Sequence, residues 1–381
     1  MSESYQAFTA ESSIPAEMFE LVNRQRTKDE AFKTKPIGFF KDAVTRLTKN
    51  KASIVSFWII ALIVFLSVFA PLMSGYGFNE QNVARVNMPP RIPLLESIGV
   101  ASGARLLENR QKAGLEDTSK YPEGSILEVR NEREVEGVAV VDVLVNYYKF
   151  IGADSEYYWF GTDYLGRDLL TRLFRGSRVS LTIAIVSVIT NLIIGTIYGA
   201  IAGYYGGKVD MLMMRICEVI SGIPQLVMIT MFIMMFGTGL LSIILALVVR
   251  GWIGTAALIR AQFYRYKGRE YVLAARTVGV RDRLLIFRHI LPNALGPLIT
   301  AAMLAVPGAI FAESFLAFIG LGLQAPEPSI GVLLSDGQSV LLHYPYQTLI
   351  PSLLISMLMI SFNLLANGLR DALDPTKRGE V

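Results

Sequence analysis

Residues 52–73 read ASIVSFWIIALIVFLSVFAPLM and carry no charged side chain. A helix needs about 20 mostly apolar residues to cross a lipid bilayer, so this stretch predicts a membrane span. Further long apolar runs cover residues 179–205, 219–236, 240–259, 294–323 and 347–369. A chain of 381 residues cannot bury so many apolar helices in one soluble core. The sequence therefore predicts an all-α membrane protein with six transmembrane helices.

The composition agrees with this prediction and excludes several kinds of site. Hydrophobic residues make up 52% of the chain and charged residues 18%, whereas soluble domains usually carry about 25% charged residues. The single cysteine, Cys217, excludes an internal disulfide and a cysteine-based zinc cage. Since His289 and His343 are the only histidines, we expect no metal site. We also expect no nucleic-acid partner.

Positive charges set the expected orientation, because Lys and Arg near a span tend to stay in the cytoplasm. Residues 1–51 carry several Lys and Arg close to the first span, which predicts a cytoplasmic N-terminal tail. Six spans then return residues 370–381 to the cytoplasm as a C-terminal tail. The loop of residues 260–288 has eight Lys and Arg against two acids and falls on the same side. Residues 163–178 depart from the rule. They are basic, but the order of the spans places them on the outer side of the membrane.

About a hundred mostly polar residues, 74–178, separate the first span from the second and are too many for a simple connector. Residues 125–130 and 135–148 contain β-branched and alternating apolar side chains, and residues 131–134 suit a turn. We therefore predict a small external α+β insertion, which is either a passive spacer or a docking surface.

Residues 159–181 read WFGTDYLGRDLLTRLFRGSRVSL, with leucines at helical spacing and arginines between them from Tyr164 onward. This pattern predicts an amphipathic helix that lies in the outer interface of the membrane. The carboxylate of Asp163 is the expected cap, because it can accept the unpaired N–H groups of a first helical turn. The residues that we assign to this interfacial motif are Gly161, Asp163, Gly166, Arg167 and Asp168.

The sequence contains no recognisable site for ATP or for nucleophilic catalysis. Gly206-Gly207-Lys208 is followed by Val209, and the spacing is not that of a phosphate-binding P-loop. So few histidines and cysteines do not suggest a catalytic triad. We therefore expect that the chain is not an enzyme and has no ATPase site of its own.

Two acidic residues lie within or beside predicted spans, where ionisable groups are costly and often functional. Glu218 lies one turn from Arg215, so a local ion pair is the simplest expectation. Glu313 lies deep in the fifth span and either pairs with Arg250 of the fourth span or lines a substrate pathway. A pathway acid would suit a proton-coupled secondary transporter, so that class stays open.

The most informative loop, residues 260–297, reads RAQFYRYKGREYVLAARTVGVRDRLLIFRHILPNALGP. Strong helix formers predict a short helix over residues 270–278, which Gly279 stops or bends. A second short helix is expected over residues 282–290, before Pro292 turns the chain toward the membrane. Two such helices would form a compact knob for a partner protein. The alternative is a basic loop that only sets the topology.

Residues 274–292 carry the pattern AA-x3-G-x11-LP, which resembles the coupling-loop signature of the permease subunits of ABC importers. Two positions depart from the family pattern. The family's glutamate falls at Leu273, although Glu270 lies one turn earlier, and its later isoleucine falls at His289. The resemblance assigns the following residues to ATPase coupling: Glu270, Ala274, Ala275, Arg276, Gly279, His289, Leu291 and Pro292.

The wider sequence is similar to the second permease of oligopeptide and dipeptide importers. The similar segments are REYVLAARTVG (269–279), FRHILPNALGPLI (287–299), ESFLAFIGLGLQAPEPSIG (313–331), FNLLANGLRDALDPTKR (362–378) and the motif at 159–181. Ile330 stands where many members of the family have tryptophan, and Ala366-Asn367 stands where they have Gly-Asp.

The resemblance implies the fold of type I ABC importer permeases, with residues 179–369 as the transmembrane core and residues 260–293 as the coupling loop. It implies a second homologous permease, two cytoplasmic ATPases that bind ATP and Mg, and an external binding protein that delivers peptide. This chain would bind no cofactor itself and would lie in the cell membrane. Nickel chelates, glutathione or opines are alternative cargoes, and a membrane scaffold without transport activity is a further alternative.

Overall fold

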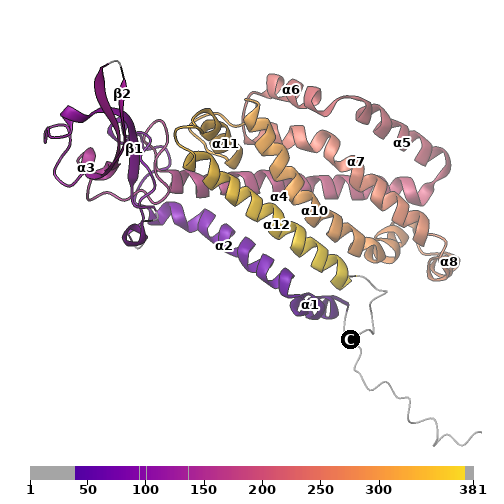
Figure 1. Cartoon of the computed structure of the whole chain (residues 1–381). Coiled ribbons are helices and arrows are strands. Elements are labelled where there is room, and N and C mark those ends of the chain that lie inside the picture. Colours follow the sequence, from indigo (N-terminus) through magenta and orange to yellow (C-terminus); the bar gives the residue numbers. More distant parts are fainter. Residues whose placement is uncertain (1–38, 94, 100, 136, 374–381) are drawn as a thin grey trace, which may run out of the picture. The chain divides into compact units, whose positions relative to one another are not determined.

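The computed structural model describes residues 39–93, 95–99, 101–135 and 137–373 of the chain (Figure 1). The chain divides into two compact units, residues 1–42 and 43–381. Helix α1 (Phe39–Lys49) is the first described element, and everything after it belongs to the second unit. Most of the expected N-terminal tail and of the C-terminal tail lies outside the described residues.

Within the described residues, five helices are long and apolar enough to cross a membrane. They are α2 (Lys51–Met73), α4 (Leu169–Tyr205), α7 (Leu240–Tyr266), the helical segment Asp282–Phe318 that ends in α10 (Leu291–Phe318), and α12 (Tyr346–Leu373). The pair α5 (Gly207–Gly222) and α6 (Gln225–Phe236) passes the same test together, with a bend of 80° between them. The predicted six spans are therefore present if this bent pair counts as one.

The break between α5 and α6 falls at Ile223-Pro224. Proline has no backbone N–H and disfavours the helical conformation of the residue before it, and Ile223 accordingly has an extended backbone with φ −82° and ψ 127°. The guanidinium of Arg250 in α7 donates a 3.2 Å hydrogen bond to the carbonyl oxygen of Ile223. Arg250 therefore satisfies an acceptor at the end of α5.

Helix α4 packs against α7 through glycines that recur every fourth residue, at Gly195, Gly199 and Gly203. A Cβ atom at Gly199 would lie 2.2 Å from the carbonyl oxygen of Ala256, and one at Gly203 would lie 2.6 Å from the Cβ of Phe263. Small residues let two helix backbones approach closely in a membrane. The glycine face of α4 therefore fixes this helix against α7.

An apolar core lies where α2, α4, α10 and α12 meet the short helix α11 (Ile330–Ser339). Each helix contributes a buried side chain, namely Ile63, Leu181, Ile310, Leu358 and, from α11, Leu333. The apolar runs of the sequence predicted no helix between residues 323 and 347, so α11 is an addition to the expected fold.

The segment between α2 and α4 contains a three-stranded antiparallel sheet in the order β1-β3-β2. The strands are β1 (Ala104–Gln111), β2 (Ile126–Val135) and β3 (Val138–Asn146). The predicted hairpin is present, but β2 continues to Val135, and Gly137, with a φ of 78°, directly precedes β3. The expected turn at 131–134 was wrong because those residues continue β2. Strand β1 was not predicted.

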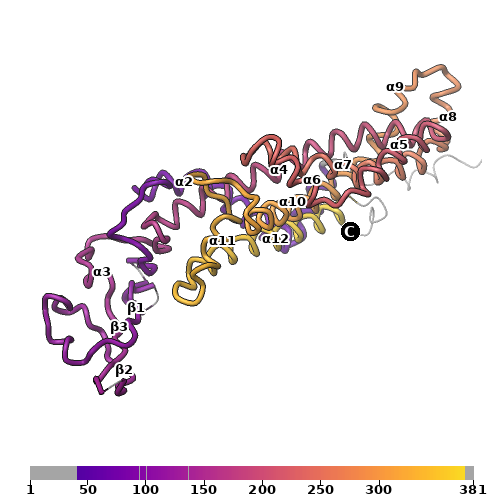
Figure 2. Tube along the Cα trace, turned by 90° about the horizontal axis from the view of Figure 1, so that it is seen from above, coloured from indigo at the N-terminus to yellow at the C-terminus, as the bar shows by residue number. Residues whose placement is uncertain are grey.

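Alternate residues of a strand face opposite sides of the sheet. Val141, Val143 and Val145 of β3 are accordingly buried on one side, together with Leu107 of β1. The sheet and helix α8 (Glu270–Thr277) lie at opposite ends of the long helices (Figures 1 and 2). The remaining short elements are α3 (Tyr147–Phe150), α9 (Asp282–Leu284), a π-helix (Leu285–Ile290) and 3-10 turns at Val83–Arg85, Glu96–Ile98 and Lys112–Gly114.

The start of α4 differs from the interfacial helix that the sequence predicts. Residues 169–205 form one continuous helix, so residues 169–178 are its first turns and not a separate element. Arg172 and Leu173 are both 2% exposed, whereas an amphipathic surface helix would expose its polar face. The prediction was wrong because a buried ion pair, rather than solvent or lipid headgroups, accommodates Arg172.

Candidate functional site

The loop between α7 and α10 begins with helix α8, which is held in place by one buried side chain. Val272 is fully buried in a cluster with Leu285 and Ile290 of the following helical segment. Leu273 is 46% exposed and Val278 is 83% exposed. The helix therefore has one face packed on the protein and one face with exposed apolar side chains.

Gly279 ends α8 as the sequence predicts. Its φ is +84°, a conformation that residues with a Cβ atom rarely adopt. Its N–H donates to the carbonyl of Arg276 at 3.0 Å, and the N–H of Val280 donates to the carbonyl of Ala275 at 3.1 Å. These two bonds are those of a Schellman motif, which satisfies the last carbonyls of a helix.

The second part of the loop corrects the expected role of Pro292. Helix α9 and the π-helix run directly into α10, so the chain does not turn at Pro292. The N–H of Leu291 bonds to the carbonyl of Ile286, five residues earlier. The wider π turn lies immediately before the proline, and proline is tolerated in a first helical turn. The helix can therefore continue through Pro292.

The predicted coupling residues lie together on this loop and at the start of α10. Ala275 and Leu291 are half-buried against the same apolar cluster. The carbonyl of His289 accepts a 2.8 Å hydrogen bond from Asn293, whose amide also donates to Tyr271 of α8 at 3.1 Å. The exposed members of the set are Glu270, Ala274, Arg276, Gly279 and Pro292.

Sequence reasoning missed Tyr204, the penultimate residue of α4. Its hydroxyl donates to Oδ1 of Asp282 at 2.5 Å and accepts from Nη2 of Arg276 at 3.2 Å. Its position beside the Gly206-Gly207 pair marks a helix end in the sequence. Nothing in the sequence indicates that this end meets a loop about 70 residues later.

Glu313 and Arg250 do not form the ion pair that was one of the two expectations. Glu313 is fully buried and accepts a 2.8 Å hydrogen bond from the hydroxyl of Ser180, while Arg250 bonds to the α5–α6 break. The alternative, that Glu313 lines a pathway, stays a prediction. Glu218 pairs with Arg215 at 2.6 Å, with both side chains exposed, which confirms the expected local ion pair.

The motif of residues 161–168 forms a buried turn rather than a membrane-interface helix. Asp163 accepts from the N–H groups of Leu165 and Arg167, and it pairs with Arg167 at 2.7 Å and with Arg172. The helix cap is Asp168, which accepts from the N–H of Thr171 at 2.9 Å. The expected cap at Asp163 was therefore wrong, because that carboxylate is engaged within the turn and by two guanidinium groups.

Gly161 and Gly166 allow this turn to pack closely. Their φ angles are +80° and +72°. A Cβ atom at Gly161 would lie 2.4 Å from the carbonyl oxygen of Met88, and one at Gly166 would lie 1.9 Å from that of Asn82. Both glycines are therefore required by the backbone conformation and by the space available.

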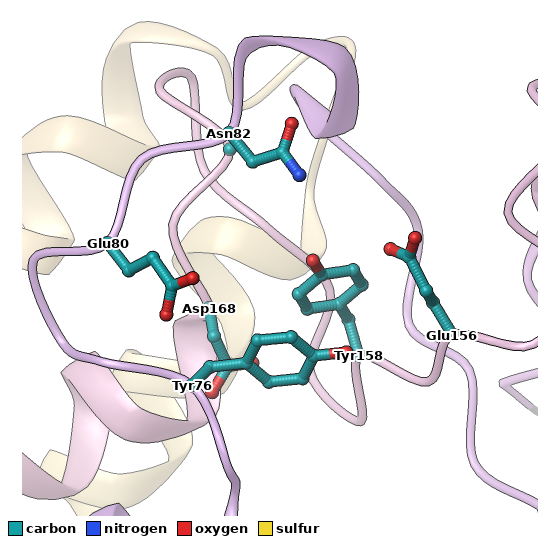
Figure 3. Close-up of a pocket in the computed structure, with 7 residues that line it drawn as sticks. Tyr76, Glu80, Asn82, Glu156, Tyr158 and Asp168 are labelled. Carbon is teal, nitrogen blue, oxygen red and sulfur yellow. The ribbon is translucent and has the colours of Figure 1, made fainter.

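A cavity of about 120 Å³ lies beside this turn, and Figure 3 shows the side chains that line it. Tyr76 stacks on Tyr158 with ring centroids 4.7 Å apart, and burial raises the pKa of the Tyr158 hydroxyl. Glu156 is held at 2.7 Å by Arg85. Among the described residues, no group of three or more His, Cys, Asp or Glu side chains could hold a metal ion.

Two family models match the chain. Residues 195–379 match the binding-protein-dependent transport system inner membrane component. Residues 38–90 match the N-terminal TM domain of oligopeptide transport permease C. The two matches together include α2, the last turns of α4, the later long helices of the core and the loop that carries α8.

Three relatives show how far the similarity extends. The oligopeptide transport system permease protein OppC of Bacillus subtilis (strain 168) is 33% identical, over 96% of this chain and 99% of that protein. The dipeptide transport system permease protein DppC of the same organism is 33% identical, over 96% of this chain and 95% of that protein. The glutathione transport system permease protein GsiD of Pectobacterium atrosepticum is 36% identical, over 58% of this chain and 73% of that protein.

The apolar helices and the family models define a multi-pass membrane protein of the permease class. The similarity to the first two relatives spans nearly the whole of each chain, so the family can be named more specifically than the permease class. The chain belongs to the family of oligopeptide and dipeptide transport permeases, the inner membrane components of binding-protein-dependent transport systems.

Proposed function

We propose that this chain is the permease subunit of an ATP-driven importer that moves oligopeptides or dipeptides across the cell membrane. The observation that carries the proposal is the similarity over nearly the whole chain to permeases of both oligopeptide and dipeptide systems. That similarity includes the segment with the sheet as well as the helical core. The proposed partners are a second homologous permease, two ATPase subunits and an external substrate-binding protein.

The proposed orientation places both termini and α8 in the cytoplasm and the sheet outside. The supporting observation is the excess of Lys and Arg in the loop of residues 260–288, since such loops tend to stay in the cytoplasm. The sheet and α8 lie at opposite ends of the long helices, as this orientation requires (Figure 2). A binding protein and an ATPase would then reach the chain from opposite sides.

The proposed contact surface for an ATPase is the exposed face of α8 together with the turn at Gly279. Leu273 and Val278 provide exposed apolar area, and exposed apolar patches commonly mark protein interfaces. The guanidinium of Arg276 can donate charge-assisted hydrogen bonds to a partner's carboxylate or backbone. Small Ala274 lets the partner approach the helix closely.

In the proposed mechanism, ATP binding brings the two ATPase subunits together and moves the loop as a rigid body. The long helices then open toward the binding protein, and ATP hydrolysis returns them to the inward-open state. Such coupling requires that the loop's contacts differ in free energy between the two states. ATP and Mg would be bound by the ATPase subunits, and this chain would supply the docking loop and part of the pathway.

Glutathione is the second candidate cargo, because one of the relatives is a glutathione transport system permease. Glutathione is itself a modified tripeptide, so a pathway that accepts peptide backbone could accept it. The similarity to that relative covers a smaller part of this chain than the similarity to the peptide permeases. Peptides are therefore the favoured cargo.

Uptake into membrane vesicles tests the cargo. The chain would be expressed with its chromosomal neighbours, and the vesicles would be supplied with radiolabelled dialanine, pentaalanine or glutathione. The expected result is uptake of at least one of the two peptides that requires ATP on the side of the ATPase subunits. Uptake of glutathione alone would replace peptides by the second candidate, and peptide uptake driven by a proton gradient without ATP would contradict the mechanism.

A further inference from the structure

The end of α4 is joined to the loop through the single hydroxyl of Tyr204. The phenol donates to Asp282 at 2.5 Å and accepts from Arg276 at 3.2 Å. Arg276 lies in the last turn of α8, and Asp282 is the first residue of α9. One side chain of α4 therefore holds both short helices of the loop.

Burial of Tyr204 and the charge of its two exposed partners favour this junction. Tyr204 is 6% exposed and belongs to the same apolar cluster as Val272 and Leu285. Both of its hydrogen-bond partners are ionised side chains, and hydrogen bonds to ionised groups are stronger than neutral ones. The guanidinium of Arg276 also lies over the Tyr204 ring, 5.6 Å from its centroid.

A second contact joins the beginning of the loop to the same end of α4. Lys267, directly after α7, donates a 2.9 Å hydrogen bond from Nζ to the carbonyl of Gly203. This carbonyl is one of the last of the helix, where a positive charge is favourable. The loop is therefore attached to α4 at both of its short helices and at its entry.

Helix α4 is in turn attached to the rest of the bundle along its length. The glycine face at Gly195, Gly199 and Gly203 fixes it to α7. Near its other end, Ser180 bonds to Glu313 of α10 and accepts from the N–H of Ile330. A displacement of the loop would therefore be carried by α4 rather than absorbed in a flexible connection.

We propose that Tyr204 is a positioning residue that clamps α8 and α9 onto the end of α4, so that movement of the loop is transmitted to the long helices. This inference rests on the proposed function, in which α8 docks an ATPase subunit. It deepens that function by naming a residue through which the docking loop acts on α4, in addition to its direct continuation into α10.

The test compares Tyr204→Phe, which removes only the hydroxyl, with Tyr205→Phe. Tyr205 is the adjacent residue, 55% exposed and edge-on to the Tyr204 ring. The purified complex in lipid vesicles would be assayed for ATP hydrolysis and for uptake of radiolabelled trialanine. We expect Tyr204→Phe to keep ATP hydrolysis within about twofold and to lower trialanine uptake per ATP by about fivefold or more. Tyr205→Phe should match the wild type.

Hydrogen exchange provides a readout that does not depend on the cargo. Addition of a non-hydrolysable ATP analogue should change exchange in residues 198–206 and in residues 270–284 together in the wild-type complex. In Tyr204→Phe the change should be confined to residues 270–284. The variant Asp282→Asn, at an exposed position, weakens the same junction from the loop side. Combined with Tyr204→Phe, it should cause little further loss of uptake per ATP.

The outcomes separate the inference from the proposed function. Wild-type uptake per ATP and wild-type exchange in Tyr204→Phe would overturn the inference alone. A lower yield of Tyr204→Phe complex with unchanged uptake per ATP would also overturn it, because the residue would then be merely structural. Another outcome is a wild-type complex that shows the hydrogen-exchange change in both segments but takes up no trialanine. That result would support the inference about Tyr204 and contradict peptide as the cargo. A wild-type chain that recovers no ATPase would overturn the proposed function, and the inference with it.

Discussion

The hydroxyl of Ser180 in α4 donates a 2.8 Å hydrogen bond to the carboxyl group of Glu313 in α10, and both side chains are fully buried. Ser180 also accepts from the N–H of Ile330 at 3.2 Å. Ser180 of α4 therefore links α10 and α11, and the acid that was a candidate pathway residue is one of its two partners. A structural role for Glu313 and a role in proton-coupled transport make different predictions.

We predict that Glu313→Gln retains ATP-driven peptide uptake within about twofold, because the amide oxygen can still accept from Ser180. Glu313→Leu should be destabilised by about 1–3 kcal/mol, since it leaves the buried Ser180 hydroxyl without its acceptor. Thermal unfolding in detergent and uptake by vesicles measure the two effects, with the exposed Glu218→Gln as control. Complete loss of uptake in a well-folded Glu313→Gln variant would instead favour a proton-coupled mechanism.

The glycine face between α4 and α7 gives a packing prediction. Gly199→Ala places a methyl group where the structure leaves 2.2 Å to a backbone oxygen, and overpacking of this kind typically costs about 1–3 kcal/mol. We expect less folded protein and a lower midpoint of thermal unfolding. Gly254→Ala in α7 is the matched control, because a Cβ atom there meets nothing within 4 Å. Equal effects of the two substitutions would show that the helices do not pack in this way.

The conformation of Gly279 gives a prediction for coupling. With φ at +84°, residues with a Cβ atom are generally strained by about 1–2 kcal/mol, Asp less than most, and the Schellman turn after α8 is weakened. We expect Gly279→Asp to lower peptide uptake per ATP by about fivefold or more. Gly268→Asp, in the same loop at a position with open space, should have a smaller effect. Normal uptake in Gly279→Asp would contradict the assignment of this turn to ATPase coupling.

The attachment of the sheet to the bundle can be tested at Arg105. Its guanidinium lies 4.7 Å from the ring centroid of Tyr147 and 4.8 Å from that of Tyr344, which precedes α12. Each cation–π contact contributes about 0.5–1 kcal/mol at a partly exposed site. We expect Arg105→Gln to accelerate hydrogen exchange in residues 104–111. The control is Arg110→Gln, at an exposed position of the same strand. Identical exchange in both variants would mean that Arg105 does not hold the sheet.

The long helices could be predicted from the sequence because their signal is local. A run such as residues 52–73 needs only length and the absence of charge, and it became α2 almost residue for residue. The turn at Gly279 was equally predictable, since helix formers followed by glycine specify it locally. The shape of the third span was less predictable from the sequence. Apolarity alone does not show that Pro224 bends the chain by 80°.

The partners of polar residues could not be predicted because they come from distant segments. Asp163 and Asp168 have the same side chain near the same helix start, and only the packing of Arg167 and Arg172 on Asp163 decides which one caps α4. Strand β1, with the sequence ARLLENRQ, lacks a clear alternation and becomes a strand by pairing with β3. Tyr204 has its role only because α8 and α9 fold back onto α4.

Co-purification tests the central claim most directly. The chain would be expressed with its native chromosomal neighbours and recovered in mild detergent, and mass spectrometry would identify what accompanies it and in what ratio. The account predicts a second six-span permease and ATPase subunits in a ratio of one to one to two, with the ATPases lost in Ala275→Glu. A chain that is recovered alone, or whose partners are unaffected by Ala275→Glu, would contradict the assignment of α8 as the ATPase-docking helix.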